Sequence, residues 1–130
     1  MSEATWEGVM PALMTEMHED GSLDLDATGK HIESCLDAGV SGFIMLGTLG
    51  ENPSLSMKEK EAVMASTVEV VNGRVPVIVG IAEYTPEFAI NTIRRAEAVK
   101  CDGLMTLPSM VDHQDPQEAL ECFSTLPSST

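Results

Sequence analysis

The sequence is poor in basic residues. Lysine and arginine together number 7, against 21 aspartate and glutamate residues, so the formal net charge is −14 at pH 7. Proteins bind nucleic acids and anionic membrane surfaces through basic patches. The shortage of positive charge therefore predicts that neither of these is a partner of the chain.

Cysteines are few, and their spacing carries no pattern. Cys35, Cys101 and Cys122 are far apart in the chain, which argues against a disulfide framework and a zinc signature. Cys35 and Cys101 lie among apolar positions, so we expect small buried thiols there. The three histidines are also scattered, without the spacing of metal ligands. No metal site and no cofactor are predicted.

Long hydrophobic runs and targeting signals are absent. No run approaches the roughly 18 apolar residues that a membrane-spanning helix needs. The first residues, MSEATWEG, are acidic and lack the basic and apolar regions of a signal peptide, so a cytoplasmic location is expected. The sequence also lacks Gly-x-Gly-x-x-Gly, Gly-Lys-Ser/Thr and Gly-x-Ser-x-Gly, the signatures of dinucleotide sites, nucleotide triphosphate sites and hydrolase nucleophiles.

Short apolar runs and helical segments alternate along the chain. Continuous apolar runs bounded by turn residues are typical of strands that are buried on both faces of a parallel sheet. Segments with helical periodicity follow them, and three of these segments begin with capping signals. The predicted strands span residues 9–14, 43–46, 75–81 and 104–107, and the caps are Ser56 with Glu59, Thr85 before Pro86, and Asp115 before Pro116. This order predicts an α/β fold built of parallel β/α units in one domain.

A glycine-bracketed turn follows the second predicted strand. Ligands of parallel α/β folds bind at the carboxyl ends of the strands, and the sequence Gly47-Thr48-Leu49-Gly50-Glu51 lies at such an end. The glycines allow unusual backbone conformations and the close approach of a ligand. The N–H groups of Thr48 and Leu49 could then converge on a small carboxylate, with the Thr48 hydroxyl as a further donor. The alternative is a glycine-rich turn without a ligand.

The order of four motifs resembles that of one enzyme family. WEGVMPALMTEMHEDGSLDLD, AGVSGFIMLGTLGENPSLSMKEK, GRVPVIVGIAEYTPEFAI and CDGLMTLPSMV together resemble the dihydrodipicolinate synthase / N-acetylneuraminate lyase family, from about residue 6 to 124. The resemblance implies a (β/α)₈ TIM barrel, of which residues 1–130 would form a single N-terminal portion, the first four β/α units. It also implies a class I aldolase-type lyase, in which a lysine forms a Schiff base with pyruvate or a related 2-oxo acid.

The resemblance assigns a role to the turn at residues 47–50. In the family this turn reads Gly-Thr/Ser-Thr-Gly-Glu and holds the carboxylate of the 2-oxo acid. Gly47, Thr48, Gly50 and Glu51 match the pattern, whereas Leu49 replaces the second hydroxyl residue and can donate only through its backbone. We therefore expect substrate binding by residues 47–50, with Thr48 as the catalytic position and Glu51 orienting the turn. The leucine favours a DapA-like lyase with another substrate over the standard synthase.

Other positions depart from the family pattern. The family's Thr-Pro-Phe after the first strand is replaced by Thr15-Glu16-Met17, and residues 107–112 lack the tyrosine of its synthases. The Schiff-base lysine belongs to the sixth strand of the family barrel. Of the lysines present, three lie in predicted helices and one ends a helix, so we expect all four to be away from the carboxyl ends of strands: Lys30, Lys58, Lys60 and Lys100.

These departures lead to several functional hypotheses. The first is an N-terminal fragment of a Schiff-base lyase that is inactive alone and self-associates through its exposed sheet edges. The second is a non-catalytic module that binds a 2-oxo acid or interacts with another protein. The third is a free-standing flavodoxin-like α/β binding domain, in which helices would cover both faces of the sheet.

Overall fold

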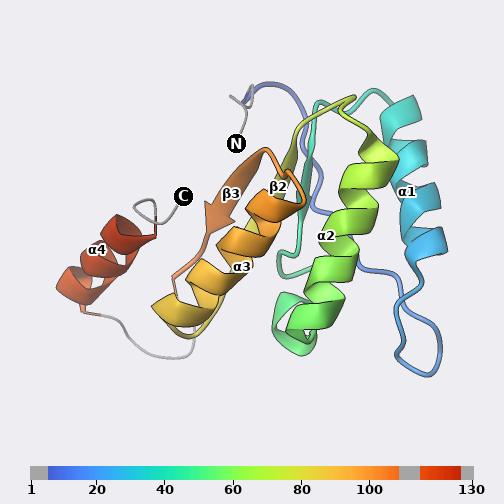
Figure 1. Ribbon diagram of the computed structural model, residues 1–130. Helices are drawn as coiled ribbons and strands as arrows, with labels where there is room; N and C mark the ends of the chain where they lie inside the picture. Colours follow the sequence, from blue (N-terminus) through green and yellow to red (C-terminus); the bar gives the residue numbers. More distant parts are fainter. Residues whose placement is uncertain (1–5, 109–114, 127–130) are drawn as a thin grey trace.

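The structure alternates parallel strands with helices. The computed structural model describes residues 6–108 and 115–126 (Figure 1). The elements follow in the order α1 (Leu25–Asp37), β1 (Phe43–Met45), the short 3₁₀ helix η1 (Asn52–Ser54), α2 (Met57–Val71), β2 (Val77–Ile81), α3 (Pro86–Ala98), β3 (Gly103–Thr106) and α4 (Pro116–Thr125). The predicted alternation of strands and helices is confirmed.

The three strands form one parallel sheet in the order β1-β2-β3. Phe43 lies opposite Val77, and Ile78 lies opposite Gly103. Every residue of β2 is buried, which is the pattern of a central strand covered on both sides. Because the strands are parallel, their carboxyl ends meet at one edge of the sheet, and the turn after β1 begins there.

The first predicted strand is only partly formed, although its segment lies beside β1 as expected. Residues 9–13 run parallel to β1, with an isolated bridge between Ala12 and Ile44. The Leu13 N–H donates to Ile44 O at 2.8 Å, and the Ile44 N–H donates to Pro11 O at 3.0 Å. Pro11 has no N–H to donate in return, so the pairing stays short. The prediction of a full strand over residues 9–14 is therefore wrong.

The predicted helix starts are confirmed by their hydrogen bonds. Ser56 and Glu59 form a reciprocal capping box, and the donors from Ser56 lower the pKa of the Glu59 carboxyl. Thr85 and Asp115 accept backbone N–H bonds at the starts of α3 and α4. The first helix also has an N-cap that was not predicted. The Asp24 carboxylate accepts from the Ala27 N–H at 2.8 Å.

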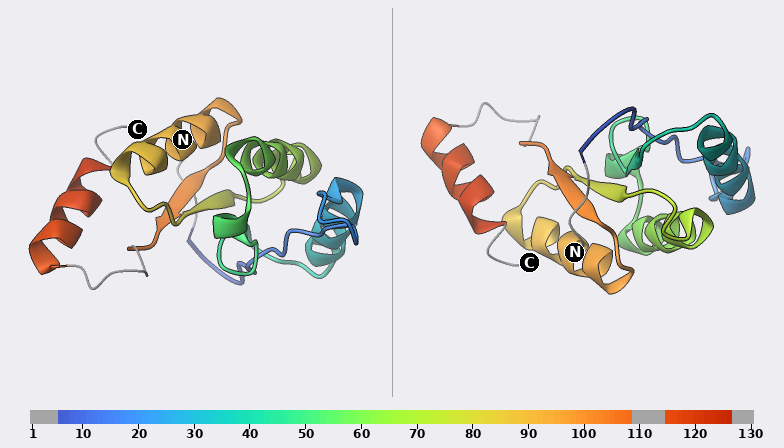
Figure 2. Two further views of the ribbon diagram at one scale, coloured as in Figure 1. Left: turned by 90° about the horizontal axis from the view of Figure 1, so that it is seen from below. Right: turned by 90° about the horizontal axis from the view of Figure 1, so that it is seen from above.

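The core lies between the sheet and one layer of helices. Helices α2 and α3 pack against β2, and α1 packs on α2, so the three helices lie side by side in chain order (Figure 2). Burial of apolar surface between these layers is the main stabilising contribution. The largest fully buried side chains include Ile32, Phe43, Met45, Met64, Ile78 and Ile93.

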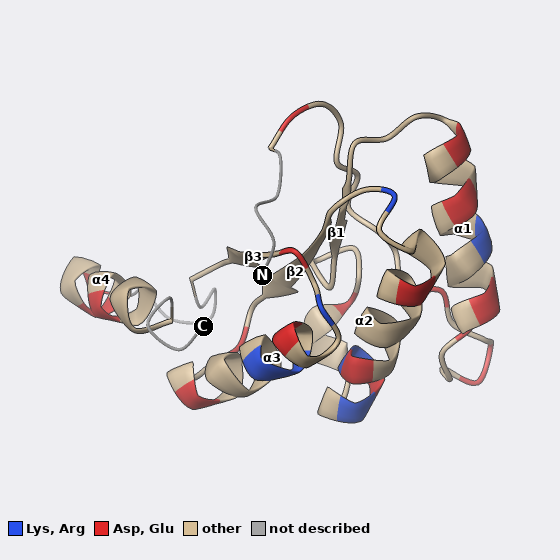
Figure 3. Cartoon of the chain, turned by 45° about the horizontal axis from the view of Figure 1, so that its top comes forward, with Lys and Arg blue, Asp and Glu red and all other residues tan. Residues whose placement is uncertain are grey.

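Acidic residues outnumber basic ones in two of the three packed helices. In α1 there are three acidic residues against one basic, in α2 three against two, and in α3 two of each (Figure 3). Cys101 is buried as predicted, whereas Cys35 is only partly buried, so the prediction is wrong there. Desolvation raises the pKa of the Cys101 thiol to about 12. None of the helices in the described part of the chain is long and apolar enough to cross a membrane.

Candidate carboxylate-binding site

The candidate site begins directly after β1. Thr48 lies three residues beyond the last strand residue, Met45, and its side chain is exposed. The neighbouring Leu49 side chain is 58% exposed, whereas Gly47 and Gly50 are buried. The structure therefore places the predicted turn at the carboxyl edge of the sheet, with its central side chains open to solvent.

The backbone of the turn differs from the prediction. The residues with positive φ are Leu46 and Glu51, both at 54°, and not the two glycines between them. Gly50 is required by close packing, because a Cβ there would lie 2.8 Å from Leu46 N. A Cβ on Gly47 would meet no atom within 4 Å. The expectation of special glycine conformations is therefore wrong, although the Gly50 backbone does pack too closely for a side chain.

The turn closes on itself and leaves two donors at its tip. The Glu51 N–H donates to Thr48 O at 3.1 Å, and the Asn52 N–H donates to Gly47 O at 3.4 Å. Within residues 6–108 and 115–126, the N–H groups of Thr48 and Leu49 have no acceptor. Two adjacent N–H groups without partners can bind an anion. Glu51 shapes the turn through its left-handed backbone, and its side chain makes no capping bond.

Two buried polar side chains that were not predicted as part of the site hold the ends of the turn. Asn52 is fully buried, and its Nδ2 donates to Leu46 O at 2.7 Å and to Gly80 O at 3.0 Å. The Thr15 hydroxyl donates to Gly50 O at 2.8 Å. Both positions fall within the motifs that resemble the family, Thr15 in the Thr-Glu-Met departure, but no local pattern indicated these contacts.

One lysine lies where none was predicted. Lys60 is buried, and its Nζ lies 2.7 Å from Oε1 of Glu83, which follows β2 by two residues. The Thr92 hydroxyl donates to the same oxygen at 3.0 Å. Because α2 follows β1, it begins near the carboxyl edge of the sheet, and Lys60 lies in its first turn. The prediction that all four lysines are away from strand ends is wrong for Lys60.

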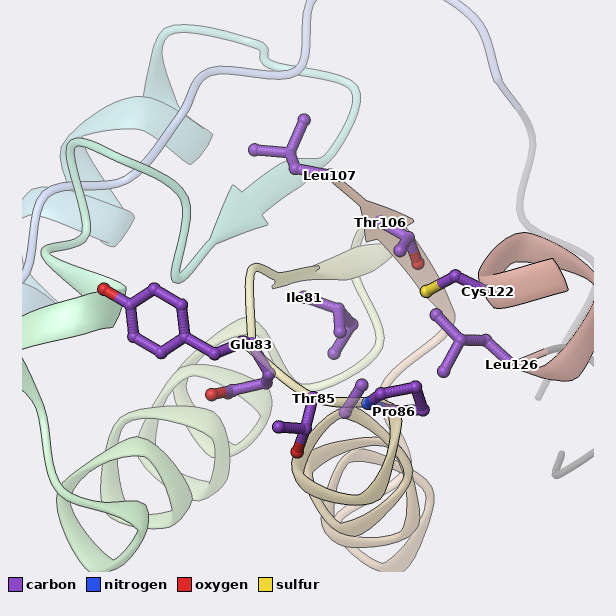
Figure 4. Close-up of a pocket in the computed structure, with 10 residues that line it drawn as sticks. Ile81, Glu83, Thr85, Pro86, Thr106, Leu107, Cys122 and Leu126 are labelled. Atoms are coloured by element: carbon purple, nitrogen blue, oxygen red, sulfur yellow. The ribbon is translucent and has the colours of Figure 1, made fainter. Parts of the chain in front are cut away.

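A small cavity lies beside the carboxyl ends of β2 and β3. Its volume is about 30 Å³, which is enough for one or two water molecules but too small for a substrate. Cys122 of α4 and Leu126, the residue that follows this helix, face Ile81 and Thr106 across it (Figure 4). The turn at residues 47–50 does not line this cavity. The candidate site is therefore the open turn and not this small cavity.

Two further expectations concern other parts of the site. Of the segment 107–112 that lacks the family tyrosine, residues 109–112 lie outside the described residues.

No group of three or more His, Cys, Asp or Glu side chains that could hold a metal ion occurs in the parts of the chain that the structure describes.

Comparison with known proteins gives a consistent result. The model of the dihydrodipicolinate synthetase family matches residues 5–130. A 4-hydroxy-tetrahydrodipicolinate synthase of Gluconacetobacter diazotrophicus is 32% identical over 130 residues, which are 100% of this chain and 44% of that protein. These matches extend over nearly all of the chain.

Solved structures show the same arrangement. Dihydrodipicolinate synthase from Aquifex aeolicus aligns with a TM-score of 0.91 at 29% identity, over 96% of this chain and 42% of that one. YagE, a prophage protein of E. coli K12 solved in complex with pyruvate, aligns with a TM-score of 0.92 at 26% identity, over 98% of this chain and 43% of that one. The chain spans less than half the length of these relatives, and the predicted fold, the first half of a TIM barrel, is confirmed.

Proposed function

Since the chain belongs to the dihydrodipicolinate synthetase family, we propose that it carries the carboxylate-binding part of a lyase active site for pyruvate or a related 2-oxo acid. The observation that carries the proposal is the turn at residues 47–50. It lies at the carboxyl edge of the sheet and offers two adjacent N–H groups without acceptors in the described residues. The complex of the related YagE protein with pyruvate supports the choice of ligand.

The turn offers hydrogen-bond donors that suit a small carboxylate. The N–H groups of Thr48 and Leu49 would donate to the carboxylate oxygens, and the exposed Thr48 hydroxyl would donate as well. Thr48 is therefore the residue that we assign to direct contact with the substrate. Leu49 would bind only through its backbone, and its apolar side chain would favour a substrate with an apolar group at that side.

The lysines of this chain do not support the covalent step. A Schiff base forms when a neutral amine attacks the ketone carbon of the substrate and water is lost, which requires a free amine beside the bound ketone. Lys30, Lys58 and Lys100 are exposed. The Lys60 ammonium is held by the Glu83 carboxylate at 2.7 Å. We therefore propose that the 130-residue chain binds the 2-oxo acid without forming an imine.

Reduction with borohydride in the presence of pyruvate tests this proposal. We expect the intact mass of the chain to stay unchanged, because no lysine is placed to form an imine that borohydride could trap. Calorimetry on the same chain without borohydride should show saturable binding of pyruvate, and the substitution Thr48→Val should weaken this binding. A stable mass adduct on any of the four lysines would refute the absence of the covalent step, and a lack of binding heat would refute the proposed ligand.

A further inference from the structure

We propose that Thr15 and Asn52 are positioning residues, which hold the turn at residues 47–50 in the conformation that presents its two N–H groups. The inference rests on the proposed function, because it assigns these residues to the carboxylate-binding turn. Neither side chain belongs to the turn tip itself. Each reaches one end of the turn from a different part of the fold.

Asn52 joins the start of the turn to the neighbouring strand. Its Nδ2 lies 2.7 Å from Leu46 O and 3.0 Å from Gly80 O, and two carbonyl oxygens can accept only from the NH₂ group. This contact fixes the orientation of the amide. Gly80 makes the approach possible, because a Cβ there would lie 2.4 Å from Leu46 O. The carboxyl ends of β1 and β2 are thus connected through one side chain.

The oxygen of the Asn52 amide, Oδ1, shows that packing alone does not explain why an asparagine lies at this position. Asn52 is fully buried, and its Oδ1 has no hydrogen-bond partner among the described residues. Burial of an unpaired polar atom is unfavourable, and an apolar residue of similar size would avoid that cost. The NH₂ group provides what an apolar residue could not, which is a partner for both Leu46 O and Gly80 O and, through these bonds, a fixed position for Leu46.

Thr15 holds the other end of the turn. Its side chain is 6% exposed, and its hydroxyl donates to Gly50 O at 2.8 Å. The residue follows the segment 9–13 that runs beside β1. The turn is therefore fixed at Leu46 by one side chain and at Gly50 by another, with Thr48 and Leu49 between the two anchors.

The two anchors matter because the turn has an unfavourable backbone conformation. Leu46 and Glu51 both adopt φ of 54°, a conformation that residues with side chains rarely adopt. Surrounding contacts must hold such residues in place. A ligand that binds a turn already in its bound conformation loses less free energy to ordering, so removal of an anchor should weaken binding.

Four variants test this inference. Thr15→Val removes the hydroxyl at nearly constant shape, whereas Thr15→Ser keeps it. Asn52→Asp replaces the donating NH₂ group with an oxygen, and Asn91→Asp makes the same change of charge at an exposed position of α3. Pyruvate affinity is measured by calorimetry. We expect Thr15→Val, which loses one hydrogen bond, to weaken binding about tenfold. Asn52→Asp loses two hydrogen bonds and should weaken binding at least as much, whereas Thr15→Ser and Asn91→Asp should bind as the wild type does.

The outcomes separate the inference from the proposed function. If the wild type binds pyruvate and Thr15→Val or Asn52→Asp binds equally well, the positioning role is refuted. If the wild type does not bind pyruvate, the proposed function fails, and hydrogen exchange decides the positioning role. The N–H groups of Glu51 and Asn52, which close the turn, should then exchange faster in Thr15→Val and Asn52→Asp than in the wild type, with α1 unchanged. Equal exchange would refute it.

Discussion

Replacement of Lys60 with methionine is expected to lower the free energy of unfolding by about 3–5 kcal/mol. The side chains of Lys60 and Glu83 are 5% and 11% exposed, and their charged atoms lie 2.7 Å apart. Removal of the ammonium leaves the Glu83 carboxylate buried, with the Thr92 hydroxyl as its one remaining donor among the described residues. An uncompensated buried charge is far more unfavourable than the loss of a surface ion pair.

Urea denaturation followed by circular dichroism measures this effect. Lys58→Met is the matched control, because Lys58 lies in the same helix and is exposed, and we expect a change within about 0.5 kcal/mol there. The double variant Lys60→Met with Glu83→Met should recover most of the loss, since it removes both charges. If Lys60→Met were as mild as Lys58→Met, the buried pair at the end of β2 would not exist in solution.

The second large effect is expected from Gly80→Ala, which should lower the free energy of unfolding by about 1–3 kcal/mol or more. The added Cβ would lie 2.4 Å from Leu46 O and 2.8 Å from Leu46 C. These are backbone atoms that a side-chain rotation cannot move. The substitution should also displace the bond from Asn52 to Gly80 O, which connects the two strand ends.

Gly29→Ala provides the control for this substitution. Gly29 lies within α1, and a Cβ there would make an ordinary contact with Val70 Cγ2 at 3.4 Å. Alanine is the better helix former, so we expect Gly29→Ala to raise the free energy of unfolding by up to about 1 kcal/mol. Thermal or urea denaturation compares the two variants. A Gly80→Ala variant as stable as the wild type would show that β1 and β2 do not approach this closely.

Local sequence signals predicted most of the fold. The Ser56–Glu59 capping box, Thr85 before Pro86 and Asp115 before Pro116 act within four residues of one another, so the sequence alone indicates where α2, α3 and α4 begin. The turn at residues 47–50 was also predictable, because it lies between an apolar run and a helix cap. Its place at the carboxyl edge follows from the parallel topology.

The contacts that support the site depend on residues far apart in the chain. Lys60 and Glu83 are separated by 23 residues, and Thr15 and Gly50 by 35. No local pattern brings such residues together, because their meeting depends on the register of the sheet. The positive φ of Leu46 was not predictable either, because no glycine or other local signal marks that position. The short pairing of residues 9–13 likewise depends on the missing N–H of Pro11.

Titration of the ¹⁵N-labelled chain with pyruvate, followed through the backbone amide resonances, tests the central claim most directly. We expect saturable shifts at the N–H groups of Thr48 and Leu49, because these two donors have no acceptor within the described residues. Thr48→Val should weaken the binding while the remaining spectrum stays that of the folded chain. Saturable shifts confined to other parts of the chain, or no shift at these two residues, would contradict the assignment of the turn as a carboxylate site.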